Sequence, residues 1–175
     1  MNPSTQLLTA GIGFGSNVGD RLQNLRTACT AVLALPGVAG SERASHLYET
    51  DPVDTEPAAG AFLNAVLELD YDGTPHSLLT ALQSIEAAMG RPSKRPRNAS
   101  RTIDLDLLYA GNLVLRNDEV VIPHPRLHKR RFVLAPLAEI RPHLKLPGYE
   151  QTITEMLNAL DDPSEVRQLE EEWTP

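Results

Sequence analysis

The feature that most limits the fold is the order in which strand-like and helix-like segments follow one another. Residues 62–71 alternate strictly between two faces, as a strand does. The other expected elements are strands over 7–14, 38–48 and 103–109, a helix from Asp20 to about 35 ended by Pro36-Gly37, and a helix over 78–89 opened by Thr74-Pro75. The order strand-helix-strand-strand-helix-strand is that of the split βαβ, ferredoxin-like arrangement. It predicts an α+β fold with a mostly antiparallel sheet and helices packed on one face.

The rest of the chain gives weaker signals. Gly111-Asn112 indicates a hairpin turn leading to residues 113–115, and 124–140 is expected to be helical after its prolines. We expect loops over 51–60 and 91–100. Residues 161–175 are acidic and predict an exposed short helix or a loose tail. A chain of 175 residues suits a single domain, which we assign to 1–160.

Composition excludes several classes of function. The formal net charge of -7 argues against a general nucleic-acid binder, which needs clustered cations. Cys29 is the single cysteine, so neither an intramolecular disulfide nor a cysteine-based zinc site is possible, and its helical spacing with Leu25 and Val32 indicates a core position. The first six residues do not read as a signal peptide, and no apolar stretch is long enough to cross a bilayer. We therefore expect a cytoplasmic protein with no membrane partner.

Two carboxylates share one face of the strand expected over 103–109. On a strand, Leu105 and Leu107 point one way while Asp104 and Asp106 point the other, about 7 Å apart at a rise of ~3.3 Å per residue. Two like charges in an apolar strand repel, so a cation should offset them. Hard oxygen ligands on a rigid strand suit Mg²⁺. An exposed edge strand with a solvated polar face is the alternative, but the apolar context and the adjacent Arg101 favour the metal.

A basic loop runs directly into this acid pair. Residues 91–101 carry Arg91, Lys94, Arg95, Arg97 and Arg101 within an acidic chain. A polyphosphate that bridges cations on both sides would explain the loop and the acid pair together. Taken alone, these basic residues could also be a solvated loop or a patch for nucleic acid. Nucleic-acid sites usually interleave aromatic residues with the basic ones, and this segment has none.

Two further motifs leave alternatives open. His124 and His128 are spaced to bind zinc on a helix, but no third ligand stands out, and we favour contacts of His124 and Arg130 with phosphate. The segment 11–17 fails as a dinucleotide fingerprint because Ser16 stands where the third glycine belongs. Its glycines could let the strand end turn beside a ligand, or could form a plain strand-to-helix turn.

Taken in order, these segments resemble the hydroxymethyl-dihydropterin pyrophosphokinase family of folate biosynthesis. The matching pieces are Gly15-Ser16-Asn17, Tyr48-Glu49-Thr50, Phe62-Leu63-Asn64-Ala65-Val66, Gln83 with Glu86, Gly90-Arg91, Arg101-Thr102-Ile103-Asp104-Leu105-Asp106, and Pro123-His124 with Arg130 and Phe132. The resemblance implies an α+β ferredoxin-like fold, ATP as donor and AMP as the second product. It also implies a monomer that acts on small molecules. Some members carry an arginine at Ser93 and a tryptophan at Asn98, which Arg95 or Arg97 could replace.

The resemblance also implies the site residues. Asp104 and Asp106 would hold a pair of Mg²⁺ ions, and both would act in catalysis with Arg91 and Arg101. The ATP site would comprise Gln83, Glu86, Arg91, Arg101, Leu107, His124 and Arg130, and the pterin slot Thr50, Val53, Phe62, Asn64 and Phe132. Aromatic faces suit a flat heteroaromatic ring, and an amide suits its polar edge. Ordinary core packing is the alternative for both phenylalanines.

Two other functions fit part of the pattern. A ferredoxin-like regulatory module that binds a small ligand explains the fold but not the acid pair beside a cationic loop. A metal-dependent phosphohydrolase would use the same carboxylates with water as the nucleophile.

Overall fold

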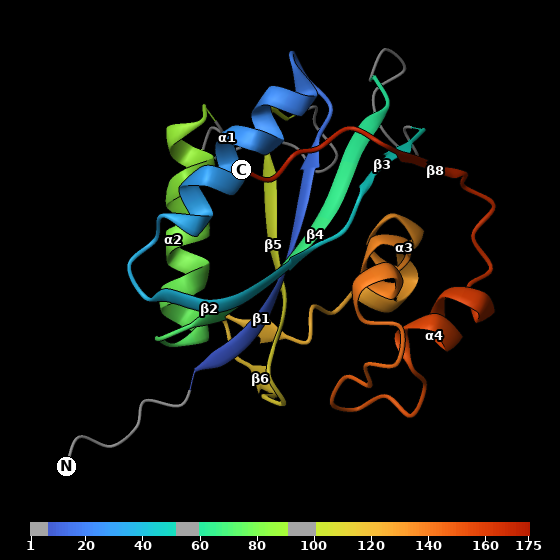
Figure 1. The fold of residues 1–175 in the computed structure, drawn as a ribbon. Helices are drawn as coiled ribbons and strands as arrows, with labels where there is room; N and C mark the ends of the chain where they lie inside the picture. The colour runs from blue at the N-terminus through green and yellow to red at the C-terminus, as the bar shows by residue number, and fades with distance from the viewer. Residues whose placement is uncertain (1–6, 52–59, 91–100) are drawn as a thin grey trace.

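The computed structural model describes residues 7–51, 60–90 and 101–175. Its elements, in chain order, are β1 (Leu8–Ser16), α1 (Arg21–Leu33), β2 (Val38–Ala44), β3 (Leu47–Thr50), β4 (Phe62–Tyr71), α2 (Pro75–Ala88), β5 (Asp104–Ala110), β6 (Leu115–Arg116), β7 (Val121–Ile122), the 3₁₀ turn η1 (Leu127–Lys129), α3 (Arg131–Ile140), α4 (Ile153–Ala159) and β8 (Val166–Leu169) (Figure 1).

The main sheet has the order β5-β1-β4-β3-β8, and β2 also pairs with β4. Every pair of neighbouring strands in the described part of this sheet is antiparallel. Helix α1 connects β1 to β2, which flank β4, and α2 connects β4 to β5, which flank β1. Each helix thus joins two strands separated by a third, as a split βαβ connection requires. The expected α+β fold with an antiparallel sheet and packed helices is confirmed.

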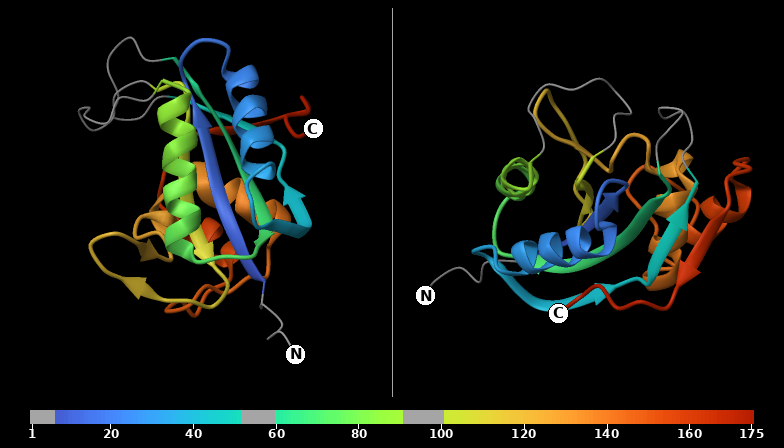
Figure 2. Two further views of the ribbon diagram at one scale, coloured as in Figure 1. Left: turned by 90° about the vertical axis from the view of Figure 1, so that its left-hand side faces the viewer. Right: turned by 90° about the horizontal axis from the view of Figure 1, so that it is seen from above.

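Helices cover both faces of the sheet, so the expectation of helices on one face is wrong. On β4, Leu63, Ala65 and Leu67 lie in the core beneath α1 and α2, whereas Val66 lies in a second core beneath α3 and α4. In the left view of Figure 2, α1 and α2 lie in front of the strands and α3 lies behind them. Burial of β4 on both sides is possible because its polar residues Asn64 and Glu68 form buried hydrogen bonds with Thr50 and Tyr109.

The helix starts follow the local signals in the sequence. The Asp20 side chain accepts a hydrogen bond from the Gln23 backbone N–H at 3.0 Å and caps α1. Thr74 and Ser77 form a capping box at the start of α2, with Pro75 in the first turn. Helix α2 therefore begins at Pro75 rather than at 78. No helix among residues 7–51, 60–90 and 101–175 combines the length and apolar character needed to span a bilayer.

Three element boundaries differ from expectation. The strand expected over 38–48 divides into β2 and β3, which are separated by Ser45 and His46. The expected turn at Gly111-Asn112 forms, because the Leu113 N–H donates to the Ala110 carbonyl at 3.1 Å, but the residues after it do not pair with β5. Instead β6 pairs with β7 as a separate two-stranded sheet. The Asn117 side chain accepts hydrogen bonds from the N–H groups of Glu119 and Val120, so the hairpin turn forms there. The expected helix over 124–140 is limited to η1 and α3.

Helix α3 is fastened to the sheet at its C-terminal end. The Glu139 carboxylate accepts hydrogen bonds from the Tyr48 hydroxyl at 2.9 Å and from the His46 backbone N–H at 3.1 Å. The same carboxylate lies 2.6 Å from His46 Nδ1. Glu139 therefore ties α3 to the bend between β2 and β3.

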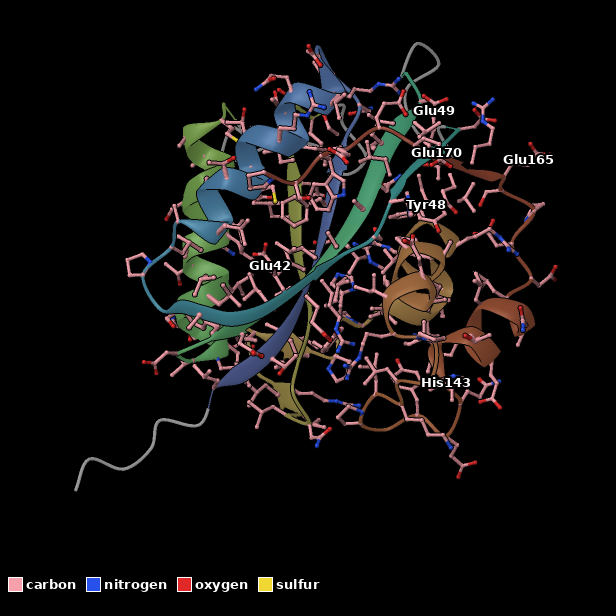
Figure 3. All side chains as sticks on the ribbon, in the orientation of Figure 1. Glu42, Tyr48, Glu49, His143, Glu165 and Glu170 are labelled. Carbon is pink, nitrogen blue, oxygen red and sulfur yellow. The ribbon has the colours of Figure 1, made fainter. Side chains whose placement is uncertain are left out.

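The C-terminal residues are neither a helix nor loose, which corrects the expectation for 161–175. Strand β8 pairs antiparallel with β3, and Trp173 is buried with 2 % of its surface exposed. Charged side chains such as Glu165 and Glu170 are exposed on this segment (Figure 3). The charges account for the acidic composition, while the pairing of β8 and the indole hold the segment in place. The division of the chain at residue 160 stays a prediction.

Candidate active site

One face of β1 carries only glycines where it crosses the middle of the sheet. Gly11, Gly13 and Gly15 all lie inside the strand rather than in a turn, and none has a positive φ. Gly15 is paired with Asn64 on β4 and with Asp104 on β5. A Cβ on Gly15 would lie 3.3 Å from Asn64 Oδ1 and 3.9 Å from Asp104 Cβ. The glycine therefore keeps open the space between the amide and the carboxylate.

The acid pair has the alternation that the sequence predicts. Leu105 and Leu107 are buried beneath α1 and α2, so Asp104 and Asp106 point to the opposite face. Each carboxylate has its own arginine: Arg101 Nη1 lies 2.7 Å from Asp104 Oδ2, and Arg130 Nη1 lies 3.2 Å from Asp106 Oδ2. Strand β5 is at the end of the strand order, but its carboxylates are ion-paired rather than simply solvated.

The charges of the site shift the pKa values of its members. Burial, and then the neighbouring charge of Asp104, raises the pKa of Asp106 above its ordinary value, while His124 and Arg130 oppose this shift. Burial lowers the pKa of His124, so its imidazole is neutral at pH 7. His124 Nδ1 accepts a hydrogen bond from the Arg126 backbone N–H at 3.2 Å. Its proton is therefore assigned to Nε2, which can donate to an anion.

The backbone around Arg101 is fixed by a residue whose role sequence reasoning missed. The Arg101 N–H donates to Asn17 Oδ1 at 2.7 Å, and the Asn17 N–H donates to the Arg101 carbonyl at 3.2 Å. Asn17 thus joins the end of β1 to Arg101, three residues before β5. Its position in the Gly15-Ser16-Asn17 motif was the available signal, because a buried amide after a strand commonly bonds to backbone.

Four of the five expected pterin-slot residues lie on the side of the sheet that carries the acid pair. Asn64 is buried and donates through Nδ2 to Thr50 Oγ1 at 2.9 Å. Phe62 begins β4 opposite Thr50 in the strand register. Phe132 lies in the first turn of α3, and its ring centroid is 5.5 Å from the Arg130 guanidinium carbon. Arg130 therefore contacts both an expected metal ligand and an expected ring-stacking residue.

Other expected ATP-site residues lie elsewhere or outside the described residues. Glu86 is buried on α2 and accepts a hydrogen bond from the Leu105 N–H at 2.7 Å. Gln83 is exposed on α2, and the Leu107 side chain is in the core beneath the helices. The expected residues Val53, Arg91, Lys94, Arg95 and Arg97 fall in the segments 52–59 and 91–100, which the structure does not describe.

The zinc alternative finds no support in the part of the chain that the structure describes. There, no three His, Cys, Asp or Glu residues come together to hold a metal ion. His128 Nδ1 lies 3.0 Å from the Tyr149 hydroxyl and is engaged with it instead.

The fold and the site define a class of protein. Paired carboxylates, each matched to an arginine, beside a buried amide on an antiparallel α+β sheet suit an enzyme that handles a phosphorylated ligand. The profile of the family described as 7,8-dihydro-6-hydroxymethylpterin-pyrophosphokinase (HPPK) matches residues 11–142. The chain belongs to this family.

Individual relatives carry the name of the same enzyme family. The chain is 40% identical over 162 residues to a 2-amino-4-hydroxy-6-hydroxymethyldihydropteridine pyrophosphokinase of Methylorubrum extorquens, covering 92% of this chain and 98% of the relative. It is 42% identical over 131 residues to the enzyme of that name in Bacillus subtilis, covering 75% of this chain and 77% of the relative. Among solved structures, wild-type Plasmodium falciparum HPPK-DHPS with pteroate matches with a TM-score of 0.68 at 14% identity, over 89% of this chain. This chain covers 45% of that one, and the likeness concerns the fold alone.

Proposed function

We propose that the protein transfers the pyrophosphoryl group of ATP to the hydroxymethyl group of 6-hydroxymethyl-7,8-dihydropterin and releases AMP, a step of tetrahydrofolate biosynthesis. One observation carries the proposal: in a chain of this family, the arginine-matched acid pair of β5 lies on the same sheet face as the buried Asn64–Thr50 pair. A phosphate-binding half and a heterocycle-binding half thus meet across Gly15.

The acid pair suits Mg²⁺. Two carboxylates on a rigid strand supply only part of an octahedral shell, and Mg²⁺ commonly takes the remainder from water and phosphate oxygens. Burial and mutual repulsion raise the pKa of Asp106 despite the nearby arginine, so a further cation would stabilise its ionised form. We assign Asp104 and Asp106 as ligands of two Mg²⁺ ions. When bound, Mg²⁺ neutralises charge on the triphosphate and eases ionisation of the attacking hydroxyl.

The cationic residues then bind and orient the triphosphate. We assign Arg101, Arg130 and the Nε2–H of neutral His124 to its oxygens. Arg91, Gln83, Glu86 and the Leu107 backbone complete the ATP site in this proposal. The pterin hydroxyl oxygen attacks the β-phosphorus in line and forms a new P–O bond. The bond between the β-phosphorus and the bridging oxygen breaks, AMP leaves with that oxygen, and the hydroxyl proton passes to solvent. Arg101 and Arg91 would stabilise the charge that shifts during this step.

The heterocycle occupies the other half of the site. We assign Phe62 and Phe132 to its two faces and Asn64, oriented by Thr50, to its polar edge, with Val53 nearby. Arg130 couples the halves because it contacts Asp106 and lies over Phe132. We also expect a monomer that acts in the cytoplasm without a nucleic-acid or membrane partner, and light scattering tests the monomer.

An assay with ATP, Mg²⁺ and 6-hydroxymethyl-7,8-dihydropterin tests the proposal. Formation of AMP and a pterin diphosphate in equal amounts, dependent on both substrates, is the expected result. Release of ADP, or ATP hydrolysis that does not need the pterin, would support a phosphohydrolase instead. Binding of either ligand with no turnover would support the regulatory module.

A further inference from the structure

The C-terminal residues 166–173, which we call the strap, begin with β8, the strand at one end of the main sheet. In the register of β8 with β3, Val166 lies opposite Thr50, and Leu169 lies opposite Leu47. After β8 the chain, red in Figure 1, runs back across the sheet and ends beside α1. The family profile ends at residue 142, so the strap lies outside the matched region.

The end of the strap is anchored by its backbone and by one indole. Trp173 Nε1 donates to the Ser45 carbonyl at 2.8 Å, at the bend between β2 and β3. The indole meets the Phe14 ring edge-on, with centroids 5.0 Å apart. Arg26 donates through Nε and Nη2 to the Glu172 carbonyl at 3.1 and 2.7 Å. Strands β1 and β3, the bend between β2 and β3, and helix α1 therefore hold the strap.

The strap contacts residues next to the site on the opposite face of the sheet, where Phe14 lies in the core beneath α1 and α2. Phe14 precedes Gly15, which lies between Asn64 and Asp104. Ser45 makes two hydrogen bonds to Val66 on β4. Its N–H donates to the Val66 carbonyl at 2.9 Å, and its hydroxyl accepts from the Val66 N–H at 3.0 Å. The strap thus fixes the β2–β3 bend relative to the strand that carries Asn64.

A chain of ion pairs makes a second connection. Arg167 Nη2 lies 2.7 Å from Glu49 Oε1, and Arg21 Nη2 lies 2.9 Å from Glu49 Oε2. Arg21 also donates through Nη1 to the Ala61 carbonyl at 2.6 Å, immediately before Phe62. Glu49, labelled in Figure 3, thereby connects the strap through Arg21 to Ala61, the residue before β4.

We propose that the strap positions the pterin side of the active site. Strand β3 has four residues, so without β8 it would be a short edge strand whose backbone pairs only with β4. Thr50 is its last residue and orients the Asn64 amide. By pairing with β3 and fixing both of its ends, the strap sets where Thr50, Asn64 and Phe62 lie. The inference rests on the proposed assignment of these three residues to the pterin.

Full-length variants test this proposal. Trp173→Ala removes the anchor, Trp173→Phe keeps a ring but loses the Nε1–H, and Arg167→Gln cuts the Glu49 connection. Glu165→Gln, at an exposed position before β8, is the matched control. Calorimetry measures two dissociation constants for each variant: that of a non-hydrolysable ATP analogue, and that of the pterin with the analogue saturating. Each titration is made at a temperature where circular dichroism shows the variant folded.

We expect Trp173→Ala to weaken pterin binding about tenfold, the scale of misplacing one or two hydrogen bonds. Trp173→Phe and Arg167→Gln should weaken it about threefold each. The analogue should bind all variants within about twofold of wild type. The KM for the pterin should rise in parallel, with a smaller change in kcat. A purely structural role predicts a different pattern, in which the binding stoichiometry falls for both ligands and the dissociation constants do not change.

Asn64→Ala, measured alongside, separates failure of this inference from failure of the proposed function. Unaltered pterin affinity in Asn64→Ala would mean that the pterin slot is wrongly assigned. Weakened affinity in Asn64→Ala with wild-type affinity in Trp173→Ala and Arg167→Gln would overturn the strap inference alone. Should Trp173→Ala not fold, Trp173→Phe and Arg167→Gln decide the question by the same comparison.

Discussion

Replacing Gly11 by alanine should be the most destabilising single-carbon change on β1. Gly11 lies opposite Tyr109, where the register of β1 and β5 shifts. A Cβ at position 11 would lie 2.2 Å from Tyr109 Cε1 and 2.6 Å from Cζ. The Tyr109 ring is 3 % exposed, and its hydroxyl donates to Glu68 Oε2 at 2.6 Å. The ring therefore has to move by more than an ångström, which breaks this hydrogen bond.

The magnitude follows from three contributions. Overpacking a dense core costs about 1–3 kcal/mol. Loss of a buried hydrogen bond to the Glu68 carboxylate costs about 1.5–3 kcal/mol more. Alanine in place of glycine within a strand returns about 0.5–1 kcal/mol. We therefore expect Gly11→Ala to lower the free energy of unfolding by about 1.5–5.5 kcal/mol, a large part of the stability of a typical domain.

Urea unfolding followed by circular dichroism measures the effect, with Gly13→Ala as the control. The three atoms nearest to a Cβ at position 13 all belong to the Leu108 side chain, the closest at 3.4 Å, so Gly13→Ala should change the free energy of unfolding by less than about 1 kcal/mol. In a Tyr109→Ala background, Gly11→Ala should cost almost nothing because the clashing ring is gone. A loss below 1 kcal/mol in the wild-type background, or an equal loss in both backgrounds, would refute the reasoning.

Three further predictions concern charge and chemistry. Asp106→Ala should abolish pyrophosphoryl transfer because it removes a proposed Mg²⁺ ligand. Circular dichroism should show an intact fold, because the change removes one of two carboxylates that repel each other. Near-normal turnover would contradict the Mg²⁺ assignment. The hydrogen bond and charge of Glu139 raise the pKa of His46 above 6.5, so this stabilisation is present below about pH 6.5 and is lost as pH rises through the folded pKa. The difference in unfolding free energy between wild type and His46→Gln should therefore shrink from pH 6 to 8, by less than about 1 kcal/mol because His46 is half exposed; a difference that grows would oppose this sign. Burial raises the pKa of the Cys29 thiol to about 12, so iodoacetamide should label it only on unfolding, and rapid labelling of folded protein would disagree with its position.

Local patterns in the sequence predict local structure well. The alternation of Asp104 and Asp106 with leucines places both carboxylates on one face, and Asp20 caps the helix that follows it. Both signals involve residues close together in the chain, where periodicity and capping decide the outcome.

Long-range partners explain most of what the sequence did not reveal. Glu68 and Asn64 make one face of β4 look solvated, yet both are buried because Tyr109 and Thr50 supply their hydrogen bonds. An acidic tail is equally compatible with disorder until the pairing of β8 with β3 and the burial of Trp173 are known. The match of Arg130 with Asp106 likewise depends on how α3 crosses the sheet.

Helix α3 is held at both ends by charged side chains, and this has a mechanical consequence. At its start, Arg130 holds Asp106, and near its end, Glu139 holds Tyr48 and His46. Because both ends are held, α3 can neither rotate nor shift relative to the sheet unless one of these interactions breaks. We expect the spacing between Phe132 on α3 and Phe62 on β4 to stay constant, so that the proposed slot admits flat ligands of one thickness and does not widen for bulkier ones.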